Sequence, residues 1–204
     1  MIKPTEILSA EHRVIEQVLD CLDRIAQTAS ESGRLDGASA KQALEFFRQF
    51  ADRCHHGKEE VHLFPAMEAH GFSRQGGPTG VMLLEHDQGR AFIRGMASTL
   101  EDASAGNRTA VSEFADHAAG YVELLRAHIE KEDHCLFSMA NQVFSEEDQQ
   151  TLLEAFHRVE HEDMEAGAHE HFIGVANELA DRFGIARAAI PAAGRCGCAL
   201  GPAR

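Results

Sequence analysis

The stretch Cys54-His55-His56-Gly57-Lys58-Glu59-Glu60-Val61-His62-Leu63-Phe64 occurs a second time as Ala127-His128-Ile129-Glu130-Lys131-Glu132-Asp133-His134-Cys135-Leu136-Phe137. Both copies contain the pattern H-x-x-K-E-E/D-x-x-L-F, at an offset of 73 residues. Upstream, Glu11-His12 recurs as Glu85-His86 at an offset of 74 residues. The chain therefore reads as a duplicated helical hairpin, in which each copy supplies one histidine on its first helix and His-x-x-x-Glu on its second.

Apolar residues recur at helical spacing along almost the whole chain, and no stretch alternates with the period of two that a strand needs. The pattern predicts an all-α fold. We expect Gly57 to weaken the second helix and Pro65 to kink it. The four long helices are predicted at about 5–28, 40–69, 79–102 and 109–139.

Four long helices with short connections predict an up-down-up-down four-helix bundle over residues 1–144. A further helical segment at 145–184, interrupted near Gly167, is expected to pack on the bundle as a C-terminal extension. The Ala-, Gly- and Pro-rich residues 185–204 are expected to form a flexible tail. At 204 residues the chain is long enough for one domain with a sizeable core.

Charge and composition exclude several classes of function. The net charge of −14 disfavours binding to nucleic acid or to anionic membrane surfaces. No apolar run approaches the roughly 20 residues of a membrane span, and five scattered cysteines do not suggest a disulfide framework. These features predict a cytoplasmic protein, and the 13 histidines mark where its chemistry lies.

The spacing of the repeated motif predicts a metal site. Residues four apart on an α-helix lie on one face about 6 Å apart, so His55 with Glu59, and His128 with Glu132, can converge on one centre. Antiparallel packing brings in His12 and His86. Nitrogen and oxygen donors without thiolate suit iron, manganese or zinc, and six donors suit two octahedral ions. We expect two iron ions, with an oxo or hydroxo bridge and with Glu59 and Glu132 as bridging carboxylates; manganese or zinc is the alternative.

The first copy leaves one choice of register open. His56 and Glu60 have the same spacing as His55 and Glu59, although alignment on the Leu-Phe pairs favours the latter. In that register His56, Glu60, His62 and His134 contact the ligands or face solvent. Tyr121, seven residues before His128, is expected either to approach the site from the same face or to be a core residue with its hydroxyl hydrogen-bonded. The sequence H-x-x-E-H at 157–161 matches an inverted zinc-peptidase pattern. We expect instead that Glu160, His161, Glu165 or His169 caps one end of the bundle and modulates access to the metals, with a solvated acidic face as the alternative.

The motif residues resemble the bacterial hemerythrin-like, or HHE cation-binding, domain over about residues 5–144. The resemblance implies a four-helix bundle with a non-haem di-iron site. Family roles include oxygen binding, oxygen or iron sensing, nitric-oxide response, peroxide chemistry and repair of iron centres. Oxygen-carrying members place a further histidine four residues after the ligand on the third helix, where this chain has Arg90, which puts simple reversible oxygen carriage in doubt. At the pseudo-symmetric position, Glu16 is expected to be exposed or ion-paired.

These observations predict a non-haem di-iron protein that binds, senses or reacts with oxygen, peroxide or nitric oxide. A di-iron oxidoreductase of the peroxidase or oxidase type, and an iron-sensing or iron-centre-repair module, are the alternatives. The partner is expected to be a small diatomic molecule or peroxide. The candidate metal ligands are His12, His55, Glu59, His86, His128 and Glu132.

Overall fold

The computed structural model describes residues 2–163 and 167–189 and is helical throughout its regular part. No strand occurs within these ranges, which confirms the predicted all-α class. Within the same ranges no helix combines the length and the apolar character that crossing a membrane requires.

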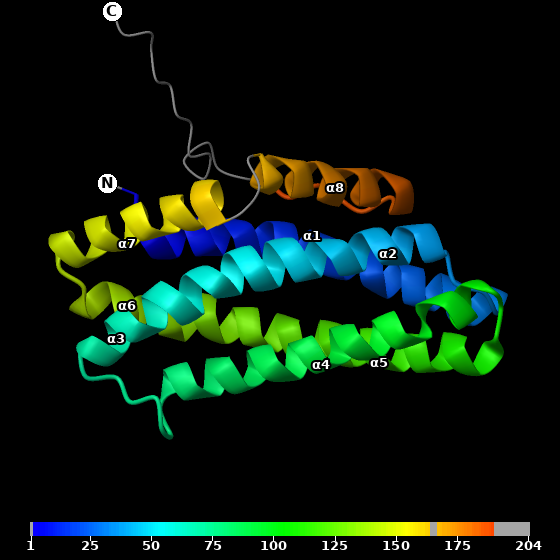
Figure 1. Ribbon diagram of the computed structural model, residues 1–204, viewed down its shortest axis with the longest axis horizontal. Coiled ribbons are helices and arrows are strands. Elements are labelled where there is room, and N and C mark those ends of the chain that lie inside the picture. Colours follow the sequence, from blue (N-terminus) through cyan, green and yellow to red (C-terminus); the bar gives the residue numbers. More distant parts are fainter. Residues whose placement is uncertain (1, 164–166, 190–204) are drawn as a thin grey trace, which may run out of the picture.

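Four long helical stretches lie side by side along the long axis of the molecule, and consecutive stretches run in opposite directions (Figure 1). The first is α1 (Pro4–Ser32), and the third is α4 (Pro78–Ser104). The second contains α2 (Gly37–Phe46), η1 (Phe47–His56), η2 (Glu59–Leu63) and α3 (Phe64–Ala69). The fourth contains α5 (Arg108–Lys131), η3 (Glu132–Leu136) and α6 (Phe137–Val143).

Local chemistry determines where these stretches begin and end. The side chain of Asp36 accepts a hydrogen bond from the Ser39 backbone at the start of α2, and Asn107 does the same for Thr109 and Ala110 at the start of α5. At the end of α1, Gly33 adopts the left-handed conformation with φ 74°, which a glycine reaches without strain. The first helix thus continues four residues beyond its expected end at Thr28.

The second and fourth stretches change helix type where the repeated motif lies. The segments η1, η2 and η3 are π-helical, with wider turns than an α-helix. Periodicity alone predicted a single α-helix with a kink at Pro65. The structure instead places Pro65 in the first turn of α3, directly after η2, where a missing backbone N–H is tolerated.

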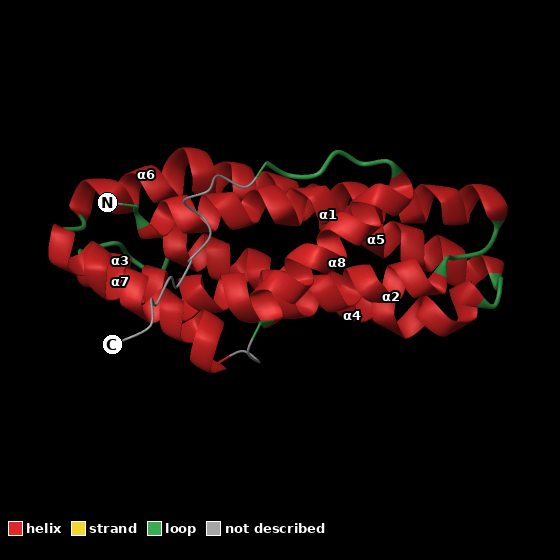
Figure 2. Cartoon of the chain, turned by 90° about the horizontal axis from the view of Figure 1, so that it is seen from above, coloured by secondary structure: helices red, strands yellow, loops and turns green. Residues whose placement is uncertain are grey.

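The C-terminal segment consists of α7 (Glu146–Arg158), η4 (Val159–Asp163) and α8 (Ala168–Phe183), which lie over one side of the four long stretches (Figures 1 and 2). Gly167, with φ 79°, precedes α8, near the predicted interruption. Phe172, Ala176 and Leu179 of α8 join the main apolar core. Of the predicted tail, residues 185–189 contact α1 through a hydrogen bond from the Ala188 backbone to Gln17. Residues 190–204, with Cys196 and Cys198, lie outside the described residues.

Two large apolar clusters make up most of the core, and a third, small one contains Cys54 and Val159. The larger of the two is built around residues such as Leu22, Phe47 and Phe114, and the smaller of the two contains both Leu-Phe pairs of the motif. Along each long stretch, the motif histidines fall in sequence between residues of the two clusters. The fold therefore places one polar layer between two dry regions.

Candidate metal centre

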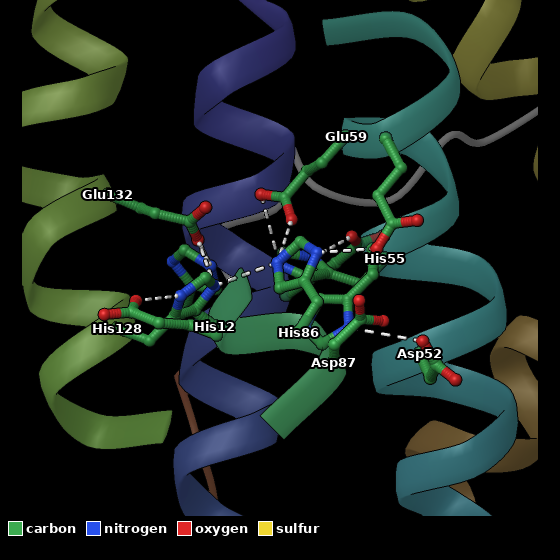
Figure 3. A network of polar contacts seen from close by, with 12 residues as sticks. His12, Asp52, His55, Glu59, His86, Asp87, His128 and Glu132 are labelled. Carbon is green, nitrogen blue, oxygen red and sulfur yellow. Dashed lines mark hydrogen bonds and ion pairs between the residues drawn. The ribbon is translucent and has the colours of Figure 1, made fainter. Parts of the chain in front are cut away.

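The six predicted ligands converge in this polar layer. The close-up shows histidines from different helical stretches pointing toward one another, with Glu59 and Glu132 beside them (Figure 3). None is more than 1% exposed. Their donor atoms fall into two groups, each with all atoms within 4.8 Å of one another, and Glu59 belongs to both. The first group is His12, His55, Glu59 and Glu132; the second is His56, Glu59, His86 and His128.

The two carboxylates connect the groups. One oxygen of Glu59 lies 3.6 Å from Nε2 of His55 and the other lies 3.5 Å from Nε2 of His86. Glu132 Oε2 lies 3.3 Å from Nε2 of both His12 and His128. Each carboxylate thus reaches one histidine of each group, as a bridging ligand between two ions must.

His56 belongs to the second group as well, whereas the register aligned on the Leu-Phe pairs places it outside the ligand set. It is 5% exposed, and its ring stacks on that of His86 with centroids 3.7 Å apart. Consecutive residues of a regular α-helix point about 100° apart, but the wider turn of η1 ends at His56 and turns both His55 and His56 inward. The spacing of three between His56 and Glu59 is the signal in the sequence that indicates this. In the second copy Ile129 takes the same position.

Every histidine of the centre is oriented by a carboxylate on its other ring nitrogen. Nδ1 of His55 lies 2.9 Å from Glu11, and Nδ1 of His86 lies 2.7 Å from Glu60. Such contacts occupy Nδ1, so that Nε2 can face a metal and is strengthened as a donor; Nε2 of His86 and Nε2 of His128 lie 3.1 Å apart. The remaining pairs are His12 with Asp133 at 2.9 Å, His56 with Asp52 at 3.4 Å, and His128 with Glu85 at 2.9 Å.

The repeated motif residues hold these carboxylates in turn. Lys58 donates to Glu11, and Lys131 donates to Glu85, so each lysine supports the acid that orients the histidine three residues before it. Arg90, at the position where oxygen-carrying hemerythrins have a histidine, donates to both Asp52 and Glu60. Nearly every letter of H-x-x-K-E-E/D therefore has a structural role.

The Leu-Phe pairs close the centre on the side of the smaller cluster. The ring of Phe137 stacks on His12 at 5.5 Å between centroids, and that of Phe64 stacks on His86 at 5.9 Å. The two contacts connect the two copies of the motif, because the phenylalanine of each copy packs on the first-helix histidine of the other. Aromatic cover excludes water and fixes the ring planes of the donors.

Burial has the largest influence on the pKa values here. It lowers the pKa of His55 and His56 to about 4 and that of His86 to about 3. At His128 the nearby Glu132 and Glu85 outweigh burial and raise the pKa to about 9. Burial and Glu132 raise the pKa of Glu59 well above its ordinary value, because two adjacent buried carboxylates cannot both stay ionised easily.

Five buried side-chain atoms of this cluster have no hydrogen-bond partner: Nε2 of His12 and both oxygens of Glu59 and of Glu132. Buried polar atoms are rarely left unpaired, since this costs about 1–3 kcal/mol each. The unpaired atoms all face the inside of the layer. The donor set of imidazole and carboxylate therefore fits divalent or trivalent ions of the iron, manganese or zinc type.

Other residues considered from the sequence lie outside the two groups. Glu16 pairs with Arg13 at 2.8 Å and is partly exposed, as expected. His134 is exposed. Glu160, the acid of the H-x-x-E-H pattern, reaches Lys58 at 2.5 Å, and His169 of α8 lies 3.4 Å from Glu11. The C-terminal extension thus contacts Glu11, the carboxylate that orients His55, and Lys58, the lysine that donates to Glu11. Sequence periodicity does not show these contacts.

A helical cluster of buried histidines and carboxylates, each oriented by an outer carboxylate, defines a helical metal-binding protein. Comparison with known families agrees: the profile of the hemerythrin HHE cation binding domain matches residues 3–140, and the chain belongs to this family. Uncharacterized proteins of Mycobacterium bovis and Mycobacterium tuberculosis are 24% identical over 177 residues, covering 86% of this chain and 67% of each relative. No solved structure matches the chain.

Proposed function

We propose that this chain is a non-haem di-iron protein that binds, senses or reacts with oxygen, peroxide or nitric oxide in a hemerythrin-like, up-down-up-down four-helix bundle. The seven proposed ligands form two metal positions, and Glu59 and Glu132 each reach a histidine of both. The set is His12, His55, His56, Glu59, His86, His128 and Glu132.

One observation carries this proposal: the buried, unpaired oxygens of Glu59 and Glu132 each lie between histidines of the two groups. A single tetrahedral zinc uses four ligands, whereas seven donors with two shared carboxylates suit a pair of ions. His56 supplies a fifth imidazole although Arg90 stands at the position of the carriers' fifth histidine.

The protein residues prepare the centre for a small ligand. Iron in such a site supplies redox chemistry and affinity for diatomic ligands and peroxide. The outer carboxylates hold the imidazole rings in place, and Phe64 and Phe137 keep water from one side of the layer. The seven residues would hold the two ions with fewer donors than two six-coordinate ions can take, so a small exogenous ligand could bind as well.

Anaerobic loading with iron tests the proposal, followed by metal analysis and optical spectra before and after oxygen is added. We expect about two irons per chain and a new charge-transfer band. A band that reverses on degassing supports oxygen binding, and an irreversible change supports redox chemistry. Failure to take up iron would refute the assignment.

The ligand role of His56 is tested by His56→Ala with His134→Ala as the control. The first variant removes a donor of the second group, so iron content is expected to fall from about two to about one per chain. The second variant removes an exposed histidine of the same motif and is expected to leave the content unchanged. Equal iron content in both variants would contradict the role of His56.

An oxidoreductase is a second candidate, because a cavity of about 230 Å³ has His56 and His86 in its wall. Steady-state consumption of peroxide or oxygen with a reductant, lost in Glu59→Ala and His128→Ala, would favour an enzyme over a binder. Loss of iron to a competing chelator within minutes would favour the iron-sensing or repair role instead.

A further inference from the structure

The C-terminal extension contacts the residues that orient His55. An oxygen of Glu160 in η4 lies 2.5 Å from Nζ of Lys58. Nε2 of His169 in α8 lies 3.4 Å from an oxygen of Glu11. Glu11 orients His55, and Lys58 donates to Glu11. The extension thus reaches the first group of proposed ligands indirectly, through the acid that orients His55 and the lysine that donates to this acid.

The corresponding pair in the second copy of the motif lacks this support. Glu85 orients His128 and receives a hydrogen bond from Lys131. Within the described residues, no hydrogen bond or ion pair joins Glu85 or Lys131 to α7, η4 or α8. Lys131 is partly exposed, whereas Lys58 and Glu11 are buried. The two copies therefore share the same local contacts but differ in what covers them.

The contact occurs where the extension departs from α-helical geometry. Four segments of the described chain are π-helical, and three of them, η1, η2 and η3, carry proposed ligands. The fourth is η4, which carries Glu160. Such π-helical turns are rare and frequently lie at functional sites. Beside Glu160, Val159 packs on Cys54, the residue before His55, and Ala168 packs against this pair.

Glu11, Glu160 and His169 resemble a third cation site, but a lysine already fills it. Their donor atoms lie within 4.8 Å of one another. The ammonium of Lys58 contacts both carboxylates, so it takes the place of a metal ion there. Contacts outside the ligands keep a metal-bound imidazole in its orientation, and losing one typically costs about 10–100-fold in metal affinity. The cluster therefore serves the histidine that Glu11 orients rather than a third ion.

We propose that Glu160 and His169 are positioning residues for the ion of the first group. Acting through Lys58 and Glu11, they hold the ring of His55 in place. The C-terminal extension therefore determines how firmly this ion is retained, whereas retention of the ion of the second group does not depend on it. The inference rests on the proposed function, because it requires two ions per chain.

Release of iron to a chelator tests this inference in the full chain. The protein is loaded with iron(II) under anaerobic conditions and mixed with an excess of a chelator that gives a coloured iron complex, so that absorbance follows the phases of release. The test variant is Glu160→Gln/His169→Gln. The matched control, Glu170→Gln/His171→Gln, makes the same two changes at exposed positions of α8.

In Glu160→Gln/His169→Gln, about half of the iron is expected to leave on the order of ten-fold faster, at the lower end of such effects because Glu11 itself remains. The other half should keep its rate, and the control variant should keep both rates. Glu85→Gln removes the acid that orients His128 in the second group, so it should speed the release of the other half instead.

The outcomes separate this inference from the proposed function. Iron content is measured first, and an unmodified chain that takes up no iron refutes both. With normal iron content, equal acceleration of both halves refutes the inference alone, because it indicates a general loss of stability. Unchanged release, an equal effect in the control variant, or acceleration of the same half by Glu85→Gln does so too. If the double variant does not fold, His169→Gln, which leaves the contact between Lys58 and Glu160 intact, provides the same test.

Discussion

Replacing Lys58 by methionine is expected to destabilise the protein far more than the same change at Lys131. The two lysines occupy the same position of the repeated motif and each supports the carboxylate that orients a histidine. Their surroundings differ: the side chain of Lys58 is 0% exposed, and that of Lys131 is 43% exposed. The comparison therefore tests the combined effect of burial and of the second acid, Glu160, on one motif lysine.

The magnitude follows from the ion pairs of Lys58. Its ammonium group contacts Glu11 and lies 2.5 Å from Glu160, and both carboxylates are buried. Burial alone would lower the pKa of Lys58, but these two acids outweigh it and keep the pKa above its ordinary value. Removing the cation takes the ammonium partner from both buried carboxylates and leaves Glu11 only the rings of His55 and His169, a change that costs about 3–5 kcal/mol. The exposed pair of Lys131 contributes at most about 1 kcal/mol.

Urea unfolding of the metal-free proteins, prepared with a chelator, measures both effects. For Lys58→Met we expect a loss of about 3–5 kcal/mol in the free energy of unfolding, and for Lys131→Met less than about 1 kcal/mol. Adding Glu160→Gln to Lys58→Met should recover part of the loss, because it removes a buried negative charge that has lost its contact with Lys58. The double variant also keeps the test informative if Lys58→Met does not fold.

Equal losses in Lys58→Met and Lys131→Met would refute this reasoning, since burial would then not determine the contribution of the motif lysine. A double variant less stable than Lys58→Met would refute the role assigned to Glu160.

Three further predictions concern stability. Gly57→Ala should raise the free energy of unfolding by about 0.4–1 kcal/mol in urea titrations, because Gly57 has helical φ −59° and ψ −42° and an added Cβ meets no atom within 4 Å; a loss of stability would contradict this. At the start of α2, burial raises the pKa of Asp36, but hydrogen bonds from Ser39 and the charge of Arg182 outweigh it and lower the pKa. Asp36→Ala should therefore cost about 1 kcal/mol above the ordinary Asp pKa, and this difference should shrink as the pH falls through the lowered folded-state pKa; a constant difference down to low pH would refute the assignment. Iron or zinc present at about 100 times its dissociation constant should stabilise the chain by about 2.7 kcal/mol in calorimetric unfolding, a chelator should reverse the effect, and Glu59→Ala should lose it; a metal-induced rise in Tm that persists in Glu59→Ala would count against Glu59 as a ligand.

Much of the candidate site can be predicted from the sequence, because local spacing and internal repetition carry the information. The spacing of four in His55 and Glu59 and in His128 and Glu132 is a helical property, so it predicts which side chains share a face before any packing is known. The duplicated motif then indicates that the two faces meet. The structure brings these four residues together with His12 and His86.

The position of His56 and the contacts of the C-terminal extension could be found only from the tertiary structure. His56 points inward because η1 has wider turns, and helix periodicity assumes an α-helix. Glu160 contacts Lys58, and His169 contacts Glu11. Each contact joins residues more than a hundred positions apart, and the local sequence pattern does not predict how the C-terminal extension packs on the bundle.

The sequence by itself determined the helical class, the duplication and the six residues expected at the centre, because each depends on the order of residues along a helix. Only the tertiary structure decided that His56 joins the buried cluster and which carboxylate contacts each histidine. These depend on burial and on distances between helices, where one turn of π-helix or a different packing of α8 changes which side chains face the same space.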